Sequence, residues 1–182
     1  VPKLQWTPDL LHCHDWHTAL APVYCRTRLA RHPVWGRMPV LYTIHNLAYQ
    51  GTFDKEVLPR LGLPWDVFRI EGLEFHGKLN LLKGGIVYAN FVNTVSPRYA
   101  FETKDQGQGF GLEPTLHTHH MKYGGVVNGI DYDVWNPEID GLIPVQYGID
   151  SIDGKYDNKR ALRHRLMLAD NEKPLVAFIG RL

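Results

Sequence analysis

Short apolar runs that alternate with helical patterns constrain the fold of this chain more than any other feature. One apolar run leads from Pro8 into residue 12, and others occupy residues 38–44, 91–95, 124–127 and 174–180. Patterns typical of helices cover residues 16–30, 55–61, 79–89, 112–120 and 156–168. Strands that alternate with helices in this way form a parallel sheet covered by helices. The sequence therefore predicts an α/β fold with a parallel sheet.

Residues 137–154 separate the predicted elements into two groups. This stretch contains Pro137 and Pro144, scattered acidic residues and no periodic apolar pattern, which is typical of a linker. We therefore predict one domain over residues 1–136, a linker over 137–154, and a second domain that begins near residue 155. The chain lacks an initial Met, and its last predicted strand stops where a loop should follow. We accordingly expect an internal segment of a longer protein.

Charge and cysteine content narrow the range of partners and environments. The 182 residues are 44% hydrophobic and carry a formal net charge of +1, so the chain can form a core but has no strong attraction to nucleic acid. The sequence shows neither a secretory signal nor an apolar run of membrane-spanning length. Its two cysteines, Cys13 and Cys25, are too few for a disulfide framework and favour a reducing compartment. We expect no nucleic-acid or membrane partner.

Polar residues follow four of the predicted strands. These pairs are His14-Asp15, His45-Asn46, Ser96-Pro97 and Asn128-Gly129, and the first belongs to a cluster of three histidines and an aspartate within residues 12–17. The carboxyl ends of parallel strands meet at one edge of a sheet, where ligands bind. Trp16, Tyr49 and Trp65 could add flat apolar faces for sugar or base rings. The sequence thus predicts a pocket for a hydroxyl-rich or phosphorylated ligand at that edge.

Four longer blocks of sequence coincide with these strand ends. They are His-Cys-His-Asp-Trp-His-Thr-Ala at 12–19, Thr-Ile-His-Asn-Leu-Ala-Tyr-Gln-Gly at 43–51, Asn-Thr-Val-Ser-Pro at 93–97, and Val-Asn-Gly-Ile-Asp at 127–131 followed by Trp135-Asn136-Pro137. In order and spacing, the blocks resemble those of bacterial glycogen synthases and plant starch synthases. The similarity runs from about Pro8 to Leu182, and the blocks together are far more specific than any one of them.

The resemblance implies a glycosyltransferase B fold of two Rossmann-like domains. A member of this family transfers glucose from ADP-glucose to the non-reducing end of an α-1,4-glucan with retention of configuration, and needs no metal ion or other cofactor. By this resemblance, residues 1–136 are the rear part of the N-terminal acceptor-side domain and residues 155–182 begin the nucleotide-sugar-binding domain. The family's Lys-Thr-Gly-Gly-Leu segment and its acid-rich donor region are absent, so we expect this piece alone to be inactive. Bacterial cytoplasm is the expected location, with the plastid stroma as the alternative.

The same resemblance suggests individual site residues. His45 resembles the family's active-site histidine, and Asp15 resembles an aspartate near the reacting sugar. Arg181 resembles the arginine that holds the donor phosphates, while Asn46 and Asn128 are candidate substrate-binding residues. These residue types suit the chemistry, because an arginine stabilises phosphate charge and a carboxylate offsets positive charge on a sugar ring.

Each assignment has an alternative. Asp15 could be a helix N-cap, and His45 could be a structural residue at a strand end. Asn128-Gly129 is typical of a turn with positive backbone φ, and the glycine-rich residues 107–111 could form an acceptor-facing loop. His12, His14 and His17 could bind zinc in a hydrolase. A non-catalytic glucan-binding module is a third possibility.

Overall fold

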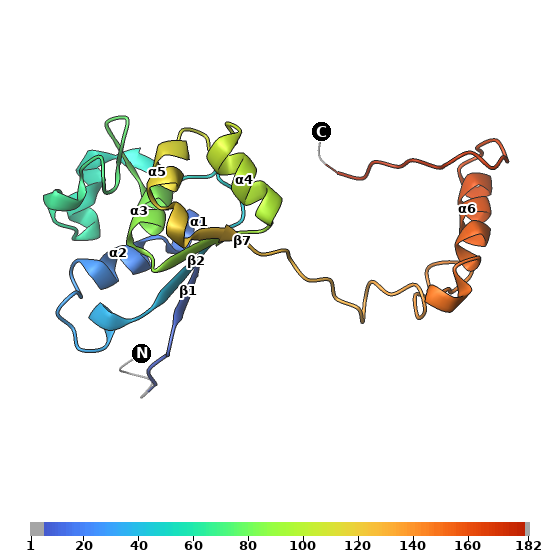
Figure 1. Ribbon diagram of the computed structural model, residues 1–182, viewed down its shortest axis with the longest axis horizontal. Coiled ribbons are helices and arrows are strands. Elements are labelled where there is room, and N and C mark those ends of the chain that lie inside the picture. Colours follow the sequence, from blue (N-terminus) through green and yellow to red (C-terminus); the bar gives the residue numbers. More distant parts are fainter. Residues whose placement is uncertain (1–5, 181–182) are drawn as a thin grey trace. The chain divides into compact units, whose positions relative to one another are not determined.

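A computed structural model describes residues 6–180 of the chain (Figure 1). The chain divides into two compact units, the first ending at Asn128 and the second beginning at Gly129. Arg181 lies outside the described residues. None of the helices within residues 6–180 is long and apolar enough to cross a lipid bilayer.

A parallel four-stranded sheet forms the centre of the first unit. Its strands are β1 (Leu11–His14), β2 (Val40–Ile44), β6 (Phe91–Thr94) and β7 (Tyr123–Gly125), in the order β1-β2-β6-β7. All three neighbouring pairs are parallel, with His14 beside Thr43 and Ile44 beside Thr94. The predicted parallel α/β sheet is therefore confirmed, and the four carboxyl ends lie at one edge.

A second, antiparallel sheet was not expected from the sequence. It contains β3 (Thr52–Asp54), β5 (Lys78–Asn80) and β4 (Glu74–Phe75) in the order β3-β5-β4. Strands of two or three residues are too short to show an alternating pattern. The helix predicted over residues 79–89 consequently begins later, at Leu81, because Asn80 caps it by accepting a hydrogen bond from the Lys83 N–H.

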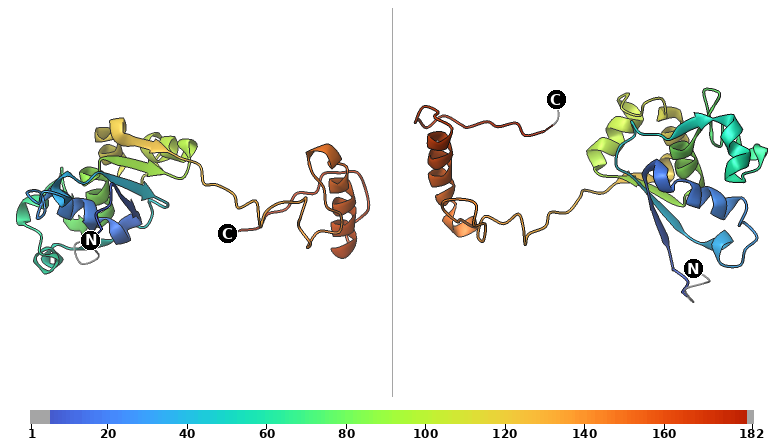
Figure 2. Two further views of the ribbon diagram at one scale, coloured as in Figure 1. Left: turned by 90° about the horizontal axis from the view of Figure 1, so that it is seen from below. Right: turned by 180° about the vertical axis from the view of Figure 1, so that it is seen from behind.

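The helices of the first unit surround the parallel sheet (Figure 2). They are α1 (Asp15–Thr18), α2 (Leu20–Arg26), α3 (Leu81–Tyr88), α4 (Pro97–Asp105) and α5 (Glu113–Thr118), with 3₁₀ turns η2 (Trp35–Arg37), η3 (Lys55–Leu61), η4 (Trp65–Val67) and η5 (His120–Lys122). The single helix predicted over residues 16–30 is thus two short helices separated at Ala19, and the one predicted over 112–120 is α5 followed by η5.

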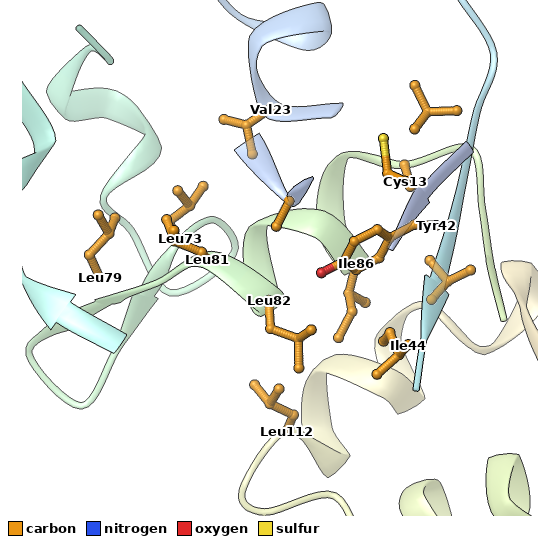
Figure 3. Packing of buried hydrophobic residues seen from close by; sticks show 14 of the residues in the cluster. Cys13, Val23, Tyr42, Ile44, Leu73, Leu79, Leu81, Leu82, Ile86 and Leu112 are labelled. Carbon is orange, nitrogen blue, oxygen red and sulfur yellow. The ribbon is translucent and has the colours of Figure 1, made fainter. Parts of the chain in front are cut away.

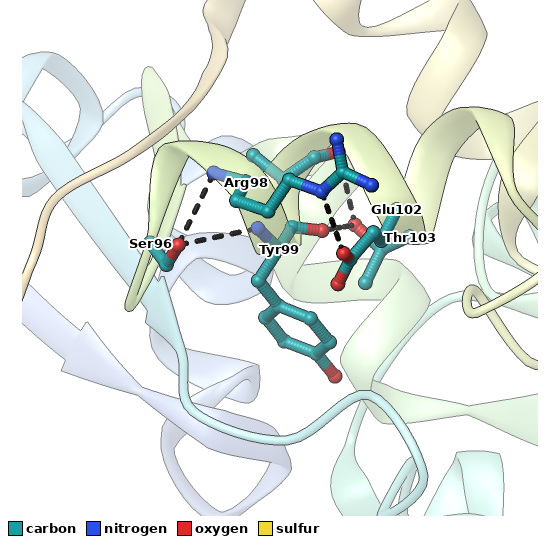
Figure 4. A network of polar contacts seen from close by, with 6 residues as sticks. Ser96, Arg98, Tyr99, Glu102 and Thr103 are labelled. Carbon is teal, nitrogen blue, oxygen red and sulfur yellow. Dashed lines mark hydrogen bonds and ion pairs between the residues drawn. The ribbon is translucent and has the colours of Figure 1, made fainter.

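The start of α4 is fixed by its cap (Figure 4). The Ser96 hydroxyl accepts hydrogen bonds from the N–H groups of Arg98 and Tyr99, at 3.1 and 3.3 Å. One turn later, Arg98 Nε donates to Glu102 at 2.8 Å. Pro97 occupies the first helical turn, as predicted, because its missing N–H would have no partner there.

The core of the first unit lies between the parallel sheet and helix α3 (Figure 3). Tyr42 and Ile44 from β2 meet Leu82 and Ile86 from α3, and all four side chains are fully buried. A methyl group on Gly85 would collide with the Tyr42 ring. The glycine in the middle of α3 therefore allows the helix to lie directly on the sheet.

The second unit contains η6 (Ile149–Ser151) and α6 (Gly154–Arg165). Arg163 of α6 is buried, and its guanidinium donates to the carbonyls of Ala169 and Lys173, at 2.7 Å each. The strand predicted over residues 174–180 is wrong, because the described part of this unit contains no strand. An apolar run forms a strand only where a neighbouring strand accepts its backbone hydrogen bonds, and β-propensity alone does not supply one.

Candidate functional site

Asp15 and His45 meet at the carboxyl edge of the parallel sheet. Asp15 begins α1 directly after β1, and His45 follows the last residue of β2. The Asp15 carboxylate accepts a hydrogen bond from the His45 N–H at 2.8 Å. His45 is exposed and Asp15 is half-buried, so both are accessible to a ligand. The expected convergence of these two residues, 30 positions apart, is therefore present in the structure.

The backbone of Asp15 is strained. Its φ is +51°, in the left-handed region that aspartate enters at some cost. The N-cap of α1 is His14, and Asp15 is the first helical residue, so the expected alternative of Asp15 as an N-cap is wrong. Its carboxylate points across to the neighbouring strand end instead of back to its own helix. Strain of this kind persists where the surroundings hold a side chain in place, and it is frequent at functional sites.

Three imidazole rings form a row beside this contact. The ring centroids of His12 and His14 are 4.2 Å apart, and those of His14 and His45 are 5.3 Å apart. His14 Nδ1 and His45 Nε2 share a hydrogen bond of 3.1 Å. One of the two nitrogens must carry the hydrogen of this bond. His45 Nε2 is therefore an acceptor if His14 Nδ1 carries a hydrogen, and a donor if it does not.

The opposite end of the row is fixed by a buried polar pair. Thr43 donates its hydroxyl proton to Asn93 Oδ1 at 2.7 Å, and the Thr43 oxygen lies 2.7 Å from His12 Nε2. The Thr43 oxygen must accept this second bond, so His12 Nε2 carries a hydrogen. Partial burial of the ring lowers the pKa of His12, and the neighbouring His14 and His45 rings lower it further. Burial and the neighbouring rings therefore favour the neutral form of His12.

His17 does not join the other two histidines of its sequence cluster. Its ring packs against Trp16, with centroids 4.1 Å apart. Within residues 6–180, no group of three or more histidine, cysteine, aspartate or glutamate side chains is placed to hold a metal ion. The zinc-hydrolase alternative, which needs His12, His14 and His17 to converge, is therefore wrong.

The remaining predicted site residues have different surroundings. Asn46 is exposed beside His45, and its side-chain oxygen accepts a hydrogen bond from the Ala48 N–H at 2.9 Å, which shapes the loop after β2. Asn128 is exposed and is the last residue of the first unit. Two residues earlier, the Val126 N–H donates to the Thr94 carbonyl at 2.8 Å, which continues the pairing of β7 with β6. Neither Asn128 nor Gly129 has a positive φ, so the expected turn there is wrong.

An aromatic cavity of about 650 Å³ opens next to Trp16. Its lining consists of one residue from α1, the segment after His45 and one residue of the glycine-rich loop: Trp16, Ala48, Tyr49, Gln50, Gly51, Thr52, Phe53 and Phe110. The Trp16 and Phe53 rings are 5.9 Å apart. A Cβ on Gly51, whose φ is +61°, would lie 2.5 Å from the Trp16 ring, so only glycine lets the loop approach that ring.

Gln50 holds this cavity together. Its side-chain nitrogen donates to the Phe110 carbonyl at 3.1 Å, and its side-chain oxygen accepts from Asn80 at 2.6 Å. The carbonyls of Gln50 and Gly51 in turn accept hydrogen bonds from the first N–H groups of α3, at 3.0 and 3.1 Å. The loop that carries His45 is thus anchored to a core helix at its far end.

Two of the three aromatic residues predicted near the site line this cavity. Trp16 and Tyr49 line the cavity as expected, but Trp65 does not, because its ring packs edge-on against Phe68 on another part of the unit. Phe53 and Phe110 were missed, since one belongs to the unexpected strand β3 and the other to an irregular loop. The glycine-rich spacing of residues 107–111 was the only sequence signal that pointed to Phe110.

The assembled edge can bind and orient a sugar. The Asp15 carboxylate offers negative charge, the His45 imidazole offers a donor or acceptor, and the neighbouring aromatic cavity offers flat faces for sugar rings. Fold and site together define a Rossmann-like domain whose carboxyl edge suits a polyhydroxylated ligand.

Comparison of the sequence with known proteins identifies the family to which this Rossmann-like domain belongs. The family model described as the starch synthase catalytic domain matches residues 1–118, and the chain belongs to that family. It is 62% identical over 181 residues to glycogen synthase 2 of Methylococcus capsulatus, with 96% of this chain and 37% of the relative covered. Glycogen synthase 1 of a Synechococcus species is 47% identical over 180 residues, with 96% and 36% covered. The chain thus spans little more than a third of the length of these relatives.

A solved structure supports the fold. The catalytic domain of starch synthase IV from Arabidopsis thaliana, bound to ADP and acarbose, matches with a TM-score of 0.76 and 36% identity. The match covers 94% of this chain and 36% of that one. The expected glycosyltransferase B architecture is therefore confirmed.

Proposed function

We propose that this chain forms the acceptor-side part of a glycogen synthase, which transfers glucose from ADP-glucose to the non-reducing end of an α-1,4-glucan with retention of configuration. In this reaction the bond between glucose C1 and the ADP oxygen breaks, C1 bonds to an acceptor hydroxyl oxygen, and the proton of that hydroxyl leaves with ADP. The observation that carries the proposal is the contact between Asp15 and His45 at the carboxyl edge of a sheet in a starch synthase catalytic domain.

The roles of the two central residues follow from their chemistry. The breaking C1–O bond places positive charge on the sugar ring, which the Asp15 carboxylate offsets, and the His45 ring orients the hydroxyls of the transferred glucose. Asn46 and Asn128 bind sugar hydroxyls, and Arg181 binds the donor phosphates through charge-assisted hydrogen bonds. The transfer needs no metal ion and no other cofactor in this proposal.

The aromatic cavity is the proposed place for the acceptor glucan. It adjoins Trp16, the residue directly after Asp15, and its lining includes four aromatic residues, Trp16, Tyr49, Phe53 and Phe110. Such faces stack on the apolar face of pyranose rings, and the row of polar groups at His45 binds their hydroxyls. The bound ADP and acarbose of the Arabidopsis starch synthase are consistent with a nucleotide donor and a glucan-like acceptor.

The domain boundaries also remain part of the proposal. Residues 1–136 form the rear of the acceptor-side domain, residues 137–154 cross between domains, and residues 155–182 begin the nucleotide-sugar-binding domain. Since the relatives are bacterial glycogen synthases almost three times as long, activity requires the whole enzyme and its proposed location is the bacterial cytoplasm.

A glucose-transfer assay on the whole enzyme that contains this chain tests the proposal. We expect incorporation of labelled glucose from ADP-glucose into a maltooligosaccharide, and little from UDP-glucose. Asp15→Asn should abolish most of the transfer, while Arg31→Gln, an exposed substitution away from the site, should leave it unchanged. Absence of transfer from either donor, with glucan binding retained, would overturn the proposal in favour of a glucan-binding module.

A further inference from the structure

A second cavity of the first unit, of about 640 Å³, lies away from the Asp15–His45 contact. Its lining residues come from the end of α2, the segment around η4 and the end of α3: Arg26, Thr27, Arg28, Gly62, Leu63, Pro64, Asp66, Val67, Arg69 and Tyr88. Helix α3 ends shortly before β6, and Arg26 at the end of α2 donates hydrogen bonds to Met38 and Asn90, which precede β2 and β6. The cavity therefore belongs to the amino edge of the sheet, opposite the edge that carries His45.

Positive charge dominates this cavity. Arg26, Arg28 and Arg69 line it, and Asp66 is the single carboxylate among the lining residues. Within the part of the chain that the structure describes, none of these arginines forms an ion pair within 4 Å. Three guanidinium charges against one carboxylate leave an excess of two positive charges, which matches a dianion.

Arg26 supplies a charge that is fixed in place. Its guanidinium donates to the Gly36 and Met38 carbonyls at 3.0 and 2.8 Å, and to Asn90 Oδ1 at 2.6 Å. These acceptors are uncharged, so they hold the guanidinium without cancelling its charge. The charge of Arg26 also acts on Lys122, which donates hydrogen bonds to the carbonyls of Val87 and Ala89. Burial lowers the pKa of Lys122 to about 8, and the positive charge of Arg26 contributes to this shift.

Arg28 and Arg69 present the more accessible guanidinium groups. Arg28 is exposed and lies over Gly62, where a Cβ would collide with its Nη1, and Gly62 has a φ of +63°. Arg69 is also exposed and its charge acts on Tyr88, which lines the same cavity. Burial raises the pKa of Tyr88, and the Arg69 charge partly offsets that rise, so the phenol stays protonated and can donate a hydrogen bond.

We propose that this amino-edge cavity binds the phosphate monoester of a small polyhydroxylated molecule, such as a sugar phosphate. The planar guanidinium groups of Arg28 and Arg69 bind the phosphate oxygens in pairs, and Arg26 adds its fixed charge. The cavity has room for more than a bare phosphate, and Asp66 accepts hydrogen bonds from hydroxyl groups on the remainder of the ligand. This inference does not depend on the proposed glucosyl transfer.

Calorimetric titration of the whole enzyme tests the site, with saturating ADP present so that the donor site is occupied. The probes are a hexose 6-phosphate, inorganic phosphate and the unphosphorylated hexose. We expect the hexose 6-phosphate to bind more tightly than inorganic phosphate and the free hexose not to bind. The double variant Arg28→Gln/Arg69→Gln should weaken hexose phosphate binding by about tenfold or more, because each lost charged hydrogen bond contributes to affinity.

Arg31→Gln is the matched control, since it removes an exposed arginine outside the cavity lining and should leave binding within about twofold of the unmodified enzyme. Circular dichroism should show that each variant is folded, and single Arg28→Gln and Arg69→Gln variants replace the double variant if it is not. Equal affinity for inorganic phosphate and hexose phosphate would overturn the assignment of a polyhydroxylated ligand. Absence of hexose phosphate binding, or equal weakening by Arg31→Gln, would overturn the site itself.

Discussion

The two edges of the parallel sheet use their polar side chains differently. At the carboxyl edge, Asp15, His14 and His45 contact one another and remain open to solvent. At the amino edge, Asn90 Oδ1 accepts hydrogen bonds from both the Val40 N–H and Arg26, so these side chains hold the starts of β2 and β6 together. At the amino edge, Asn90 and Arg26 thus stabilise the starts of the strands, whereas at the carboxyl edge the side chains that directly follow the strands remain available for a ligand. Substitutions at each edge should therefore have different consequences.

The largest effect is expected for Asp15→Asn at the carboxyl edge. Asparagine tolerates the left-handed backbone and keeps an oxygen for the His45 N–H, but it lacks the negative charge. We expect kcat of the whole enzyme to fall by about 10²–10³-fold with little change in thermal stability. Initial rates of glucose transfer measure this effect, and an Asp15→Asn enzyme with full activity would contradict a functional carboxyl edge.

Gly85→Ala tests how closely helix α3 packs on the parallel sheet between its two edges. The added methyl group would collide with the buried Tyr42 ring, and we expect the free energy of unfolding to fall by about 2–3 kcal/mol through overpacking. Gly124→Ala is the control, because its Cβ would lie 3.7 Å from the Phe91 ring, an ordinary contact. Urea denaturation compares the two variants, and equal midpoints would show that α3 does not lie tightly on the sheet.

Arg26→Met tests the amino edge. The substitution leaves the Gly36 and Met38 carbonyls and Asn90 Oδ1 without their guanidinium donor, and should lower the free energy of unfolding by about 2 kcal/mol. Arg31→Met should change it by less than about 0.5 kcal/mol, as is usual for exposed positions. If both variants unfold at the same urea concentration, Arg26 does not stabilise the strand starts.

A smaller effect of opposite sign is expected for Tyr42→Phe. Among the described residues, the Tyr42 hydroxyl is one of the buried polar groups without a hydrogen-bond partner. Its removal should raise the free energy of unfolding by up to about 1 kcal/mol. Tyr123→Phe should lower it by a similar amount, since the Tyr123 hydroxyl is 2.7 Å from Thr103 Oγ1. Destabilisation by both substitutions would mean that Tyr42 has a polar partner.

The smallest effect concerns pH and His12. Its pKa is lower in the folded protein than in the unfolded chain, so below about pH 6.5 the unfolded chain binds the proton more readily and stability falls as the pH falls. His12→Gln keeps a donor for Thr43 but does not titrate, so its melting temperature should fall less between pH 7.5 and 5.5 than that of the unmodified protein. Melting curves at the two pH values measure the difference, and identical falls would show that His12 is not held neutral.

The sequence was sufficient to predict the parallel sheet but not the short antiparallel sheet of β3, β4 and β5. β-branched runs such as 38–44 and 91–95 identified β2 and β6, because buried parallel strands need continuous apolar residues. Strands β3, β4 and β5 are too short for any pattern. The run at 174–180 shows the opposite error, since it has strand composition but no pairing within the described residues. Strand formation depends on a partner that propensity cannot supply.

The candidate site shows a similar limit. The order of strands and helices was enough to bring Asp15 and His45 to one edge, because the carboxyl ends of parallel strands always meet there. The bond between His14 and His45 and the positions of Phe53 and Phe110 depend on loop geometry fixed by contacts such as Gln50 with Phe110. The contacts of Arg26 could not be predicted from the sequence, since its carbonyl partners, Gly36 and Met38, lie in and just after a 3₁₀ turn that has no sequence pattern.

A double-mutant cycle on the whole enzyme tests most directly whether Asp15 and His45 work together in glucose transfer. The measured quantity is kcat with ADP-glucose and a maltooligosaccharide for Asp15→Asn, His45→Gln and the double variant. Residues that act on the same transition state are strongly non-additive, so the double variant should be about as slow as the slower single variant. Losses that multiply would show that the two residues act independently, and would contradict a shared site at the carboxyl edge of the sheet.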